Sequence, residues 1–157
     1  MTTALIILPL AAALVVWLLP LPGRISGALA LLVALAEVAL WAVVLGGFDF
    51  DRGLQFENQQ SWFSDLGVSY HVGFFGFSLW LTGAAVIASA AAIGYAVWIG
   101  RDRPRAYYAL MLFLTGAIVA TFASQDLLLF YISFEAMSIV SAAVQGRCGV
   151  ASRARLK

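Results

Sequence analysis

The chain has 157 residues, of which 63% are hydrophobic and 11% are charged, whereas about 25% of the residues of a typical soluble domain are charged. A soluble fold of this size cannot bury so much apolar surface, so the composition excludes a soluble protein and indicates an integral membrane protein. The net charge of +1 argues against a nucleic-acid partner, and the single cysteine excludes a disulfide framework or a cysteine-ligated metal site.

Long stretches with almost no charge predict the membrane helices. A helix needs about 20 apolar residues to cross about 30 Å of hydrocarbon, and five stretches are long enough. The fold class is therefore all-α, a polytopic helical membrane protein with about five transmembrane helices. Pro20 and Pro22 are expected to end the first helix, the Gly46-Gly47 pair the second, and Pro104 to open the fourth. The predicted spans are residues 3–19, 26–45, 77–99, 106–123 and 126–145.

The first span is predicted to be retained rather than cleaved, because no lysine or arginine precedes Arg24 and a signal peptide begins with positive charge. Eight of the nine basic residues lie in the 20–25 turn, the 100–105 loop and the end of the chain. The positive-inside rule then predicts an external N-terminus and a cytoplasmic C-terminus. The chain divides into membrane helices at 1–145 and a basic cytoplasmic tail at 146–157.

Glu135 is the residue most indicative of function. It lies nine residues after Asp126, which is about 13–14 Å along a helix and near the middle of the bilayer. A carboxylate at that depth costs several kcal/mol unless it is protonated, paired or hydrated. Tyr131, Ser138 and Gln145 share its helical face, forming a polar stripe expected to face protein or water. The sequence predicts a proton relay; the alternative is a structural pair with a basic group on another helix.

Other polar positions favour structural interpretations. Glu37 has only apolar neighbours on its helix, and either pairs with a neighbouring subunit or remains protonated. Ser124 is expected to cap the fifth helix next to Asp126, and His71 to lie at the membrane interface. The Arg101–Arg105 run is expected to anchor the topology. No nucleotide motif is present, so we expect no cofactor in this chain.

Two packing features are also predicted. Small side chains recur every fourth residue along the third helix, and such rows let membrane helices approach closely. An aromatic belt is expected where that helix begins. The small residues are Ala84, Ala88, Ala92 and Ala96, and the aromatic residues are Phe74, Phe75, Phe77 and Trp80.

Two segments carry a resemblance to a known family. Residues 66–79 (LGVSYHVGFFGFSL) and 126–137 (DLLLFYISFEAM) resemble the third and fifth helices of subunit M, the antiporter-like proton-pumping membrane subunit of NADH-quinone oxidoreductase (respiratory complex I). The resemblance covers roughly residues 1–140. Phe75 and Phe134 depart from the family pattern, which usually has aspartate and tryptophan there. The last residues resemble nothing in the family, as expected of a frameshifted or truncated gene.

The resemblance implies that Glu135 is a proton-transfer residue and that the chain lies in the cell (inner) membrane beside other membrane subunits of the respiratory complex. It implies that the chain takes part in enzyme activity only as a subunit of that translocase. The other subunits would bind the nucleotide and transfer the electrons. The alternatives from other functional classes are a subunit of a multisubunit cation/proton antiporter, which shares the fold, and an inactive fragment.

Overall fold

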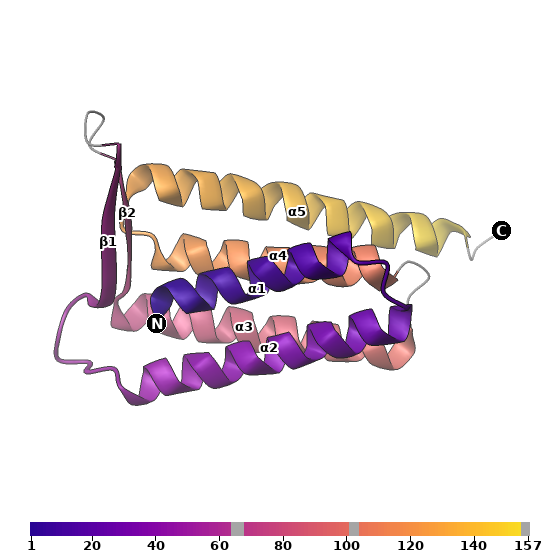
Figure 1. Cartoon of the computed structure of the whole chain (residues 1–157), viewed down its shortest axis with the longest axis horizontal. Coiled ribbons are helices and arrows are strands. Elements are labelled where there is room, and N and C mark those ends of the chain that lie inside the picture. The colour runs from indigo at the N-terminus through magenta and orange to yellow at the C-terminus, as the bar shows by residue number, and fades with distance from the viewer. Residues whose placement is uncertain (64–67, 101–103, 155–157) are drawn as a thin grey trace.

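The computed structural model describes residues 1–63, 68–100 and 104–154, with side chains at 1–60, 69–100 and 104–145. Five helices lie side by side and a two-stranded hairpin crosses one end of the bundle (Figure 1). We call this the hairpin end. The elements in chain order are α1 (Thr2–Leu18), α2 (Gly23–Gly46), β1 (Gln55–Phe63), β2 (Val68–Phe74), α3 (Gly76–Ile99), α4 (Pro104–Ala123) and α5 (Leu127–Ala154).

The predicted helical membrane fold is confirmed. Four of the helices are long and apolar enough to cross a membrane, and α1 is a slightly shorter apolar helix of 17 residues. Pro104 opens α4 and α2 ends at Gly46, as expected. Helix α5 continues to Ala154, so no helix end marks the boundary expected at residue 145.

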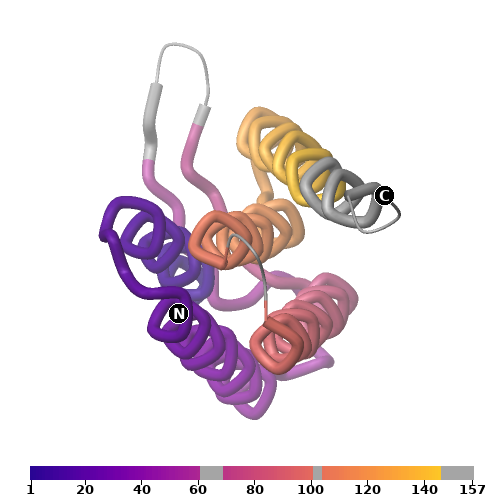
Figure 2. Tube along the Cα trace, turned by 90° about the vertical axis from the view of Figure 1, so that its right-hand side faces the viewer, coloured from indigo at the N-terminus to yellow at the C-terminus, as the bar shows by residue number. Residues whose placement is uncertain are grey.

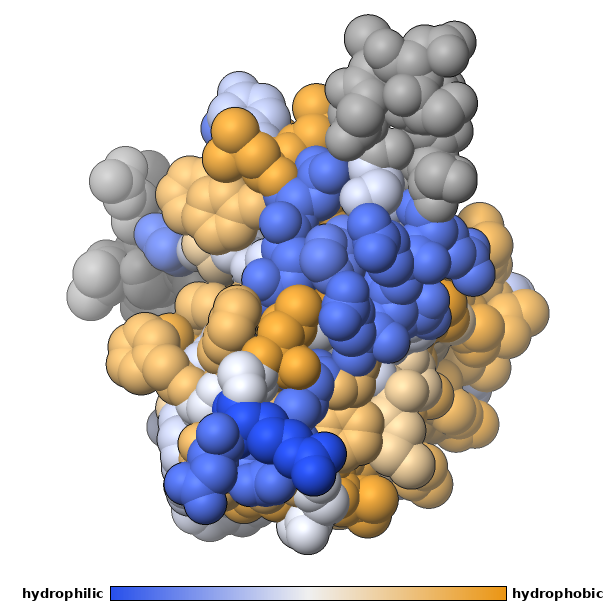
Figure 3. All heavy atoms as spheres, turned by 90° about the vertical axis from the view of Figure 1, so that its left-hand side faces the viewer, coloured by the Kyte–Doolittle hydropathy of each residue, from blue (hydrophilic) through white to orange (hydrophobic). Residues whose placement is uncertain are grey.

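The connection between α2 and α3 forms a β-hairpin, which the sequence analysis did not predict. Strands β1 and β2 pair antiparallel, with irregular register between Gln55 and Asn58. Phe56 lies at this irregularity with φ of +52°, the left-handed conformation that occurs at some bulges. The hairpin end presents a group of hydrophilic side chains between apolar flanks (Figure 3).

Helix α4 is the centre of the bundle. It contacts each of the other four helices, and an end-on view shows it surrounded by them (Figure 2). Two clusters of buried apolar residues fill the interior. The hairpin-end cluster includes Trp41, Leu79 and Val119, and the far-end cluster includes Ala34, Ile93 and Leu112. Helix α5 packs against α4 and β2 and is the least buried of the four long spans.

The close approach of α2 and α3 is made by a glycine and a tryptophan. The Trp41 ring lies over Gly83, where an added Cβ would be 2.2 Å from the ring. Its indole Nε1–H donates to the Leu79 carbonyl at 2.9 Å. The predicted alanine row is only partly correct as a packing face, because Ala84 and Ala88 are exposed, whereas Ala96 is fully buried in the far-end cluster. Small residues occur on every side of α3, so the bulky side chain on α2 decides which side packs.

The predicted aromatic belt is only partly correct. Phe75, Phe77 and Trp80 are exposed on the surface of the helices, as such a belt requires. Phe74 is fully buried instead, within the hairpin-end cluster. The difference arises because Phe74 is the last residue of β2 rather than part of a helix, and the strand directs its side chain inward.

We predict that Gly83→Ala destabilises the bundle, because the new Cβ overlaps the Trp41 ring; overpacking of this kind costs about 1–3 kcal/mol. Gly94→Ala on the same helix is the matched control, since its Cβ would make an ordinary 3.6 Å contact with Leu31. The melting temperature in detergent should fall for the first variant and stay level or rise for the second. Equal melting temperatures would show that the Trp41 ring moves aside freely.

Candidate functional site

Glu135 lies on the side of α5 that faces away from the bundle. Between residues 127 and 145, where the side chains of α5 are described, the buried residues are Ser133 and Val140. Successive helical residues are about 100° apart. Glu135, two residues after Ser133, therefore points to nearly the opposite side, and its side chain is exposed. No described element of this chain covers it.

The polar stripe predicted around Glu135 lies on this same outward side. Tyr131, Ser138 and Gln145 are all exposed. The Ser138 hydroxyl donates to the Phe134 carbonyl at 2.9 Å, and the Gln145 amide donates to the Ser141 hydroxyl at 3.2 Å. Neither of the two ion pairs formed by described residues involves Glu135. The stripe thus lies on the outward side of α5, where exposed apolar side chains such as Leu128 and Ile139 flank it.

Glu37 has the opposite environment. Its side chain is 0% exposed, and neither carboxyl oxygen has a hydrogen-bond partner among the described residues. Because it lies inside the bundle, the structure contradicts one of the two alternatives, pairing with a neighbouring subunit; the other, a protonated acid, stays a prediction. Helix α4 lies between α2 and α5 (Figure 2), so the structure does not bring the two membrane carboxyl groups together.

Asp126 joins the hairpin to the start of α5. Its carboxylate accepts the backbone N–H groups of Ser69 at 3.2 Å and of Leu128 at 2.8 Å. The Ser69 bond is the main reason that its pKa lies below the ordinary value of 3.8. The predicted Ser124 cap was wrong, because that hydroxyl donates back to the Ala120 carbonyl at 2.6 Å. The acid itself caps α5.

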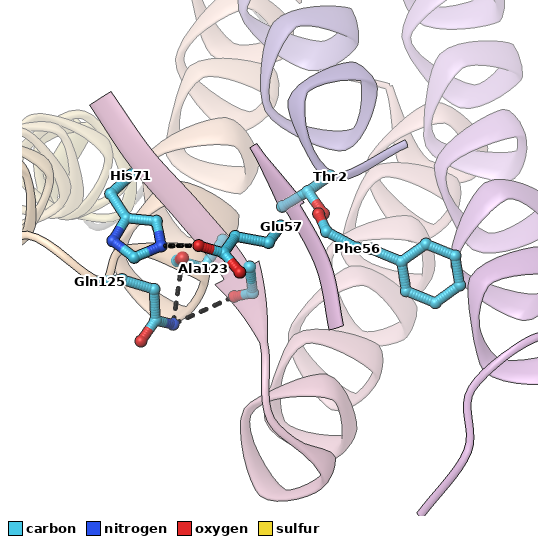
Figure 4. Close-up of polar contacts among 7 residues, drawn as sticks. Thr2, Phe56, Glu57, His71, Ala123 and Gln125 are labelled. Atoms are coloured by element: carbon cyan, nitrogen blue, oxygen red, sulfur yellow. Dashed lines mark hydrogen bonds and ion pairs between the residues drawn. The ribbon is translucent and has the colours of Figure 1, made fainter. Parts of the chain in front are cut away.

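Further contacts attach the hairpin to the α4–α5 turn (Figure 4). The Gln125 side-chain amide donates to the Gly73 carbonyl at 3.2 Å, and the Gln125 backbone N–H donates to the His71 carbonyl at 2.9 Å. His71 Nε2 lies 2.7 Å from a carboxylate oxygen of Glu57 across the hairpin. On the other side the Thr2 hydroxyl donates to the Phe56 carbonyl at 2.7 Å. These residues, which sequence reasoning missed except for His71, form a structural cap.

The cap contains no evident metal centre. Among the residues that the structure describes, no three histidine, cysteine, aspartate or glutamate side chains are grouped closely enough to hold an ion. The His71 Nε2 atom already has a hydrogen-bond partner, the Glu57 carboxylate. The two carboxyl groups that lie within the helices are Glu37 and Glu135.

Comparison with known proteins identifies relatives of one kind. The chain is 37% identical over 139 residues to NAD(P)H-quinone oxidoreductase chain 4 of Synechococcus sp. (strain RCC307), an alignment that covers 86% of this chain and 25% of the relative. It is 35% identical over 136 residues to chain 4 1 of Nostoc sp. (strain PCC 7120), covering 85% and 25%. The values for chain 4-2 of Synechocystis sp. (strain PCC 6803) are 35% over 136 residues, covering 85% and 24%.

The chain thus spans about a quarter of the length of these relatives. A scan against protein-family profiles finds no match. The relatives agree with the complex I resemblance, but they do not distinguish one antiporter-like subunit from another. The similarity extends over most of the chain.

We predict that Asp126→Asn loosens the attachment of the hairpin. The lowered pKa means that the ionised carboxylate stabilises the fold above pH 3.8, and that this contribution is lost as the pH falls below that value. At neutral pH the variant should exchange the Ser69 and Leu128 amide hydrogens faster than the wild type, measured by hydrogen exchange in detergent. The ratio of the two rates should approach one only after the pH has fallen through the lowered pKa of Asp126, which lies below 3.8. A ratio of one at neutral pH would refute the attachment, and Asp51→Asn in the exposed turn is the control.

Proposed function

We propose that this chain is part of the membrane arm of a proton-translocating NAD(P)H-quinone oxidoreductase, as a segment of its antiporter-like subunit M. The observation that carries the proposal is the 31–37% identity to chain 4 proteins over as much as 86% of the chain. The names of these proteins state the reaction of the whole enzyme. Nucleotide binding and electron transfer are assigned to other subunits, consistent with the absence of a nucleotide motif in this sequence.

Glu135 is the proposed proton-transfer residue of the segment. Its carboxyl group lies about 12 Å from the start of α5, counting 1.5 Å per residue, and its side chain points away from the bundle. A carboxylate at this depth requires a partner or water. A basic group that approaches from another helix favours the ionised form, and its withdrawal favours the acid, so the oxygen can take up a proton from one side and release it to the other.

The exposed stripe indicates how the segment joins its partner. Tyr131, Ser138 and Gln145 supply hydroxyl and amide groups on both sides of Glu135 along α5. The Ser138 and Gln145 side chains already form hydrogen bonds within α5. Lipid chains offer no partner to the Glu135 carboxyl group or the Tyr131 hydroxyl, whereas helices of the same complex or a file of water molecules do. We therefore propose that the outward side of α5 contacts further membrane helices, with Glu135 at that interface.

We propose that the hairpin end is external and the opposite end cytoplasmic, in the cell membrane. Arg24 begins α2 and Arg105 lies in the first turn of α4, both at the end opposite the hairpin, where Arg105 donates to the Leu19 carbonyl. Arg52 lies at the hairpin end, paired with Asp49 at 3.1 Å. The positive-inside rule then sets the orientation.

The orientation is tested by cysteine labelling in a Cys148→Ser background, which removes the native thiol. An impermeant maleimide added to whole cells should label Gly53→Cys, in the connection before the hairpin, and should label Arg24→Cys only after the membrane is opened. The reverse pattern would overturn the proposed orientation. Labelling of both positions in sealed cells would show that the protein is not inserted as proposed.

Glu135→Gln in the assembled enzyme tests the relay. Glutamine keeps the volume and removes the exchangeable acid proton, so we expect normal assembly on native gels and NADH oxidation by the peripheral arm, with proton pumping in vesicles reduced at least tenfold. Glu135→Asp should retain part of the pumping if water bridges the shorter side chain. Asp51→Asn makes the same chemical change outside the membrane and should pump normally.

Full pumping by the glutamine variant would show that Glu135 is not the relay. Loss of assembly would instead identify a structural pair, because removing one member of a buried pair destabilises the protein. Sodium-driven proton movement without quinone reduction would favour a cation/proton antiporter.

A further inference from the structure

A layer of unusual residues crosses the middle of the α1–α4 bundle. The far-end cluster reaches Ala34 on α2 and the hairpin-end cluster resumes at Trp41, with Glu37 between them. The other three helices show the same interruption between residues of the two clusters. Each interruption contains a buried residue that is either polar or a proline inside the helix. These four residues, which we call the mid-bundle layer, are Pro9, Glu37, Ser89 and Thr115.

Three of the four positions lie at similar depths. Counted at 1.5 Å per residue from the hairpin end of each helix, Pro9 and Thr115 lie about 11–12 Å deep and Glu37 about 13–14 Å deep. Ser89 on α3 lies somewhat deeper, at about 20 Å. The layer therefore occupies the central part of the membrane rather than either interface.

Glu37 is the only member of the layer that carries an ionisable group. Both of its oxygens are buried without a hydrogen-bond partner among the described residues. The Thr115 hydroxyl donates to the Met111 carbonyl of its own helix at 2.9 Å. An isolated carboxylate cannot remain ionised in such surroundings without a large desolvation cost, whereas the acid form carries no net charge.

The helices packed around Glu37 supply no compensating charge. Helix α1 has no titratable side chain, and that of Tyr95 on α3 is exposed on the surface. The titratable residues of α4 lie in its first turns, where Tyr108 packs against Gly27. Gly27 is ten residues before Glu37, about 15 Å along α2, and Arg24 is farther still. No described basic group is therefore placed to hold Glu37 as an ion pair.

We propose that Glu37 is a second proton-binding site of this chain, which exchanges its proton with water that enters the mid-bundle layer. On release, the carboxyl O–H bond breaks, the electron pair stays on the oxygen, and the proton passes to a water molecule. Binding is the reverse step. The site is separate from Glu135 and does not depend on the proposed assembly into an oxidoreductase.

The surroundings favour a proton over a metal cation. Hard cations need several oxygen ligands at once, whereas the layer has one carboxyl group whose oxygens contact no other described polar atom within hydrogen-bond distance. A proton needs a single oxygen. Trp41, one turn from Glu37 on α2, lies toward the hairpin end with its ring seated on Gly83, and the Glu37 side chain has no contact with external solvent.

The test is infrared spectroscopy of the whole chain in lipid nanodiscs at neutral pH. A carbonyl stretching band of a protonated carboxylic acid should be present in the wild type, shift when water is replaced by D₂O, and disappear in Glu37→Gln. Glu135→Gln is the matched control, because it makes the same change in the other membrane carboxyl group and should leave this band in place. Glu37→Leu should fold with an unchanged or higher melting temperature, since it removes an unpartnered polar group.

Each other result would overturn the proposal. A missing band, or a band that survives Glu37→Gln, would show that Glu37 is ionised. A Glu37 band that stays unshifted in D₂O would show a locked proton and a purely structural acid. Loss of the band on addition of sodium at constant pH would identify a cation site. A marked fall in the melting temperature of both Glu37 variants would reveal a structural partner.

Discussion

Close seating of bulky side chains against glycine is the constraint on which this bundle depends. In a membrane the lipid tails are as apolar as the helices, so association relies on tight packing rather than on expulsion of water. The Trp41 ring rests on Gly83 between α2 and α3, and Leu10 rests on Gly116 between α1 and α4. Each glycine lies where even a methyl group would overlap its partner. These contacts set the spacing of the helices that surround α4.

The seating of α2 against α3 also fixes the environment of Glu37. Trp41 and Glu37 are four residues apart and thus share one side of α2. The side that turns Trp41 toward Gly83 therefore turns Glu37 inward as well. On another side of α2 the Glu37 carboxyl group would be exposed and could be hydrated. It is buried because the packing of Trp41 turns this side of the helix inward.

The hairpin imposes a second constraint at one end of the bundle. It is hydrogen-bonded to the α4–α5 turn through Gln125 and Asp126, and to the start of α1 through Thr2. These bonds join segments that are more than 50 residues apart in the chain. They satisfy backbone groups of both strands and of the α5 N-terminus, where an unpaired group would be costly beside the membrane. The outward side of α5, with Glu135, is left open.

The sequence by itself determined the class of protein and the places of its helices. Charge-free length and the prolines and glycines at the helix ends are local properties, so the predicted spans agree with the structure to within about three residues at most ends. It also singled out Glu135, because the cost of a carboxylate at mid-membrane depth follows from position along one helix.

Only the tertiary structure decided which sides of the helices meet. Glu37 and Glu135 are each the one carboxyl group of an apolar helix, although polar residues share a helical face only with Glu135; Glu37 is buried inside the bundle, whereas Glu135 faces outward. Helix α3 also has small residues on more than one side. The sequence alone does not show that Gly83 packs against α2 while Ala84 and Ala88 are exposed. The burial of one side chain depends on partners brought together from distant parts of the chain, and no single helix contains that information.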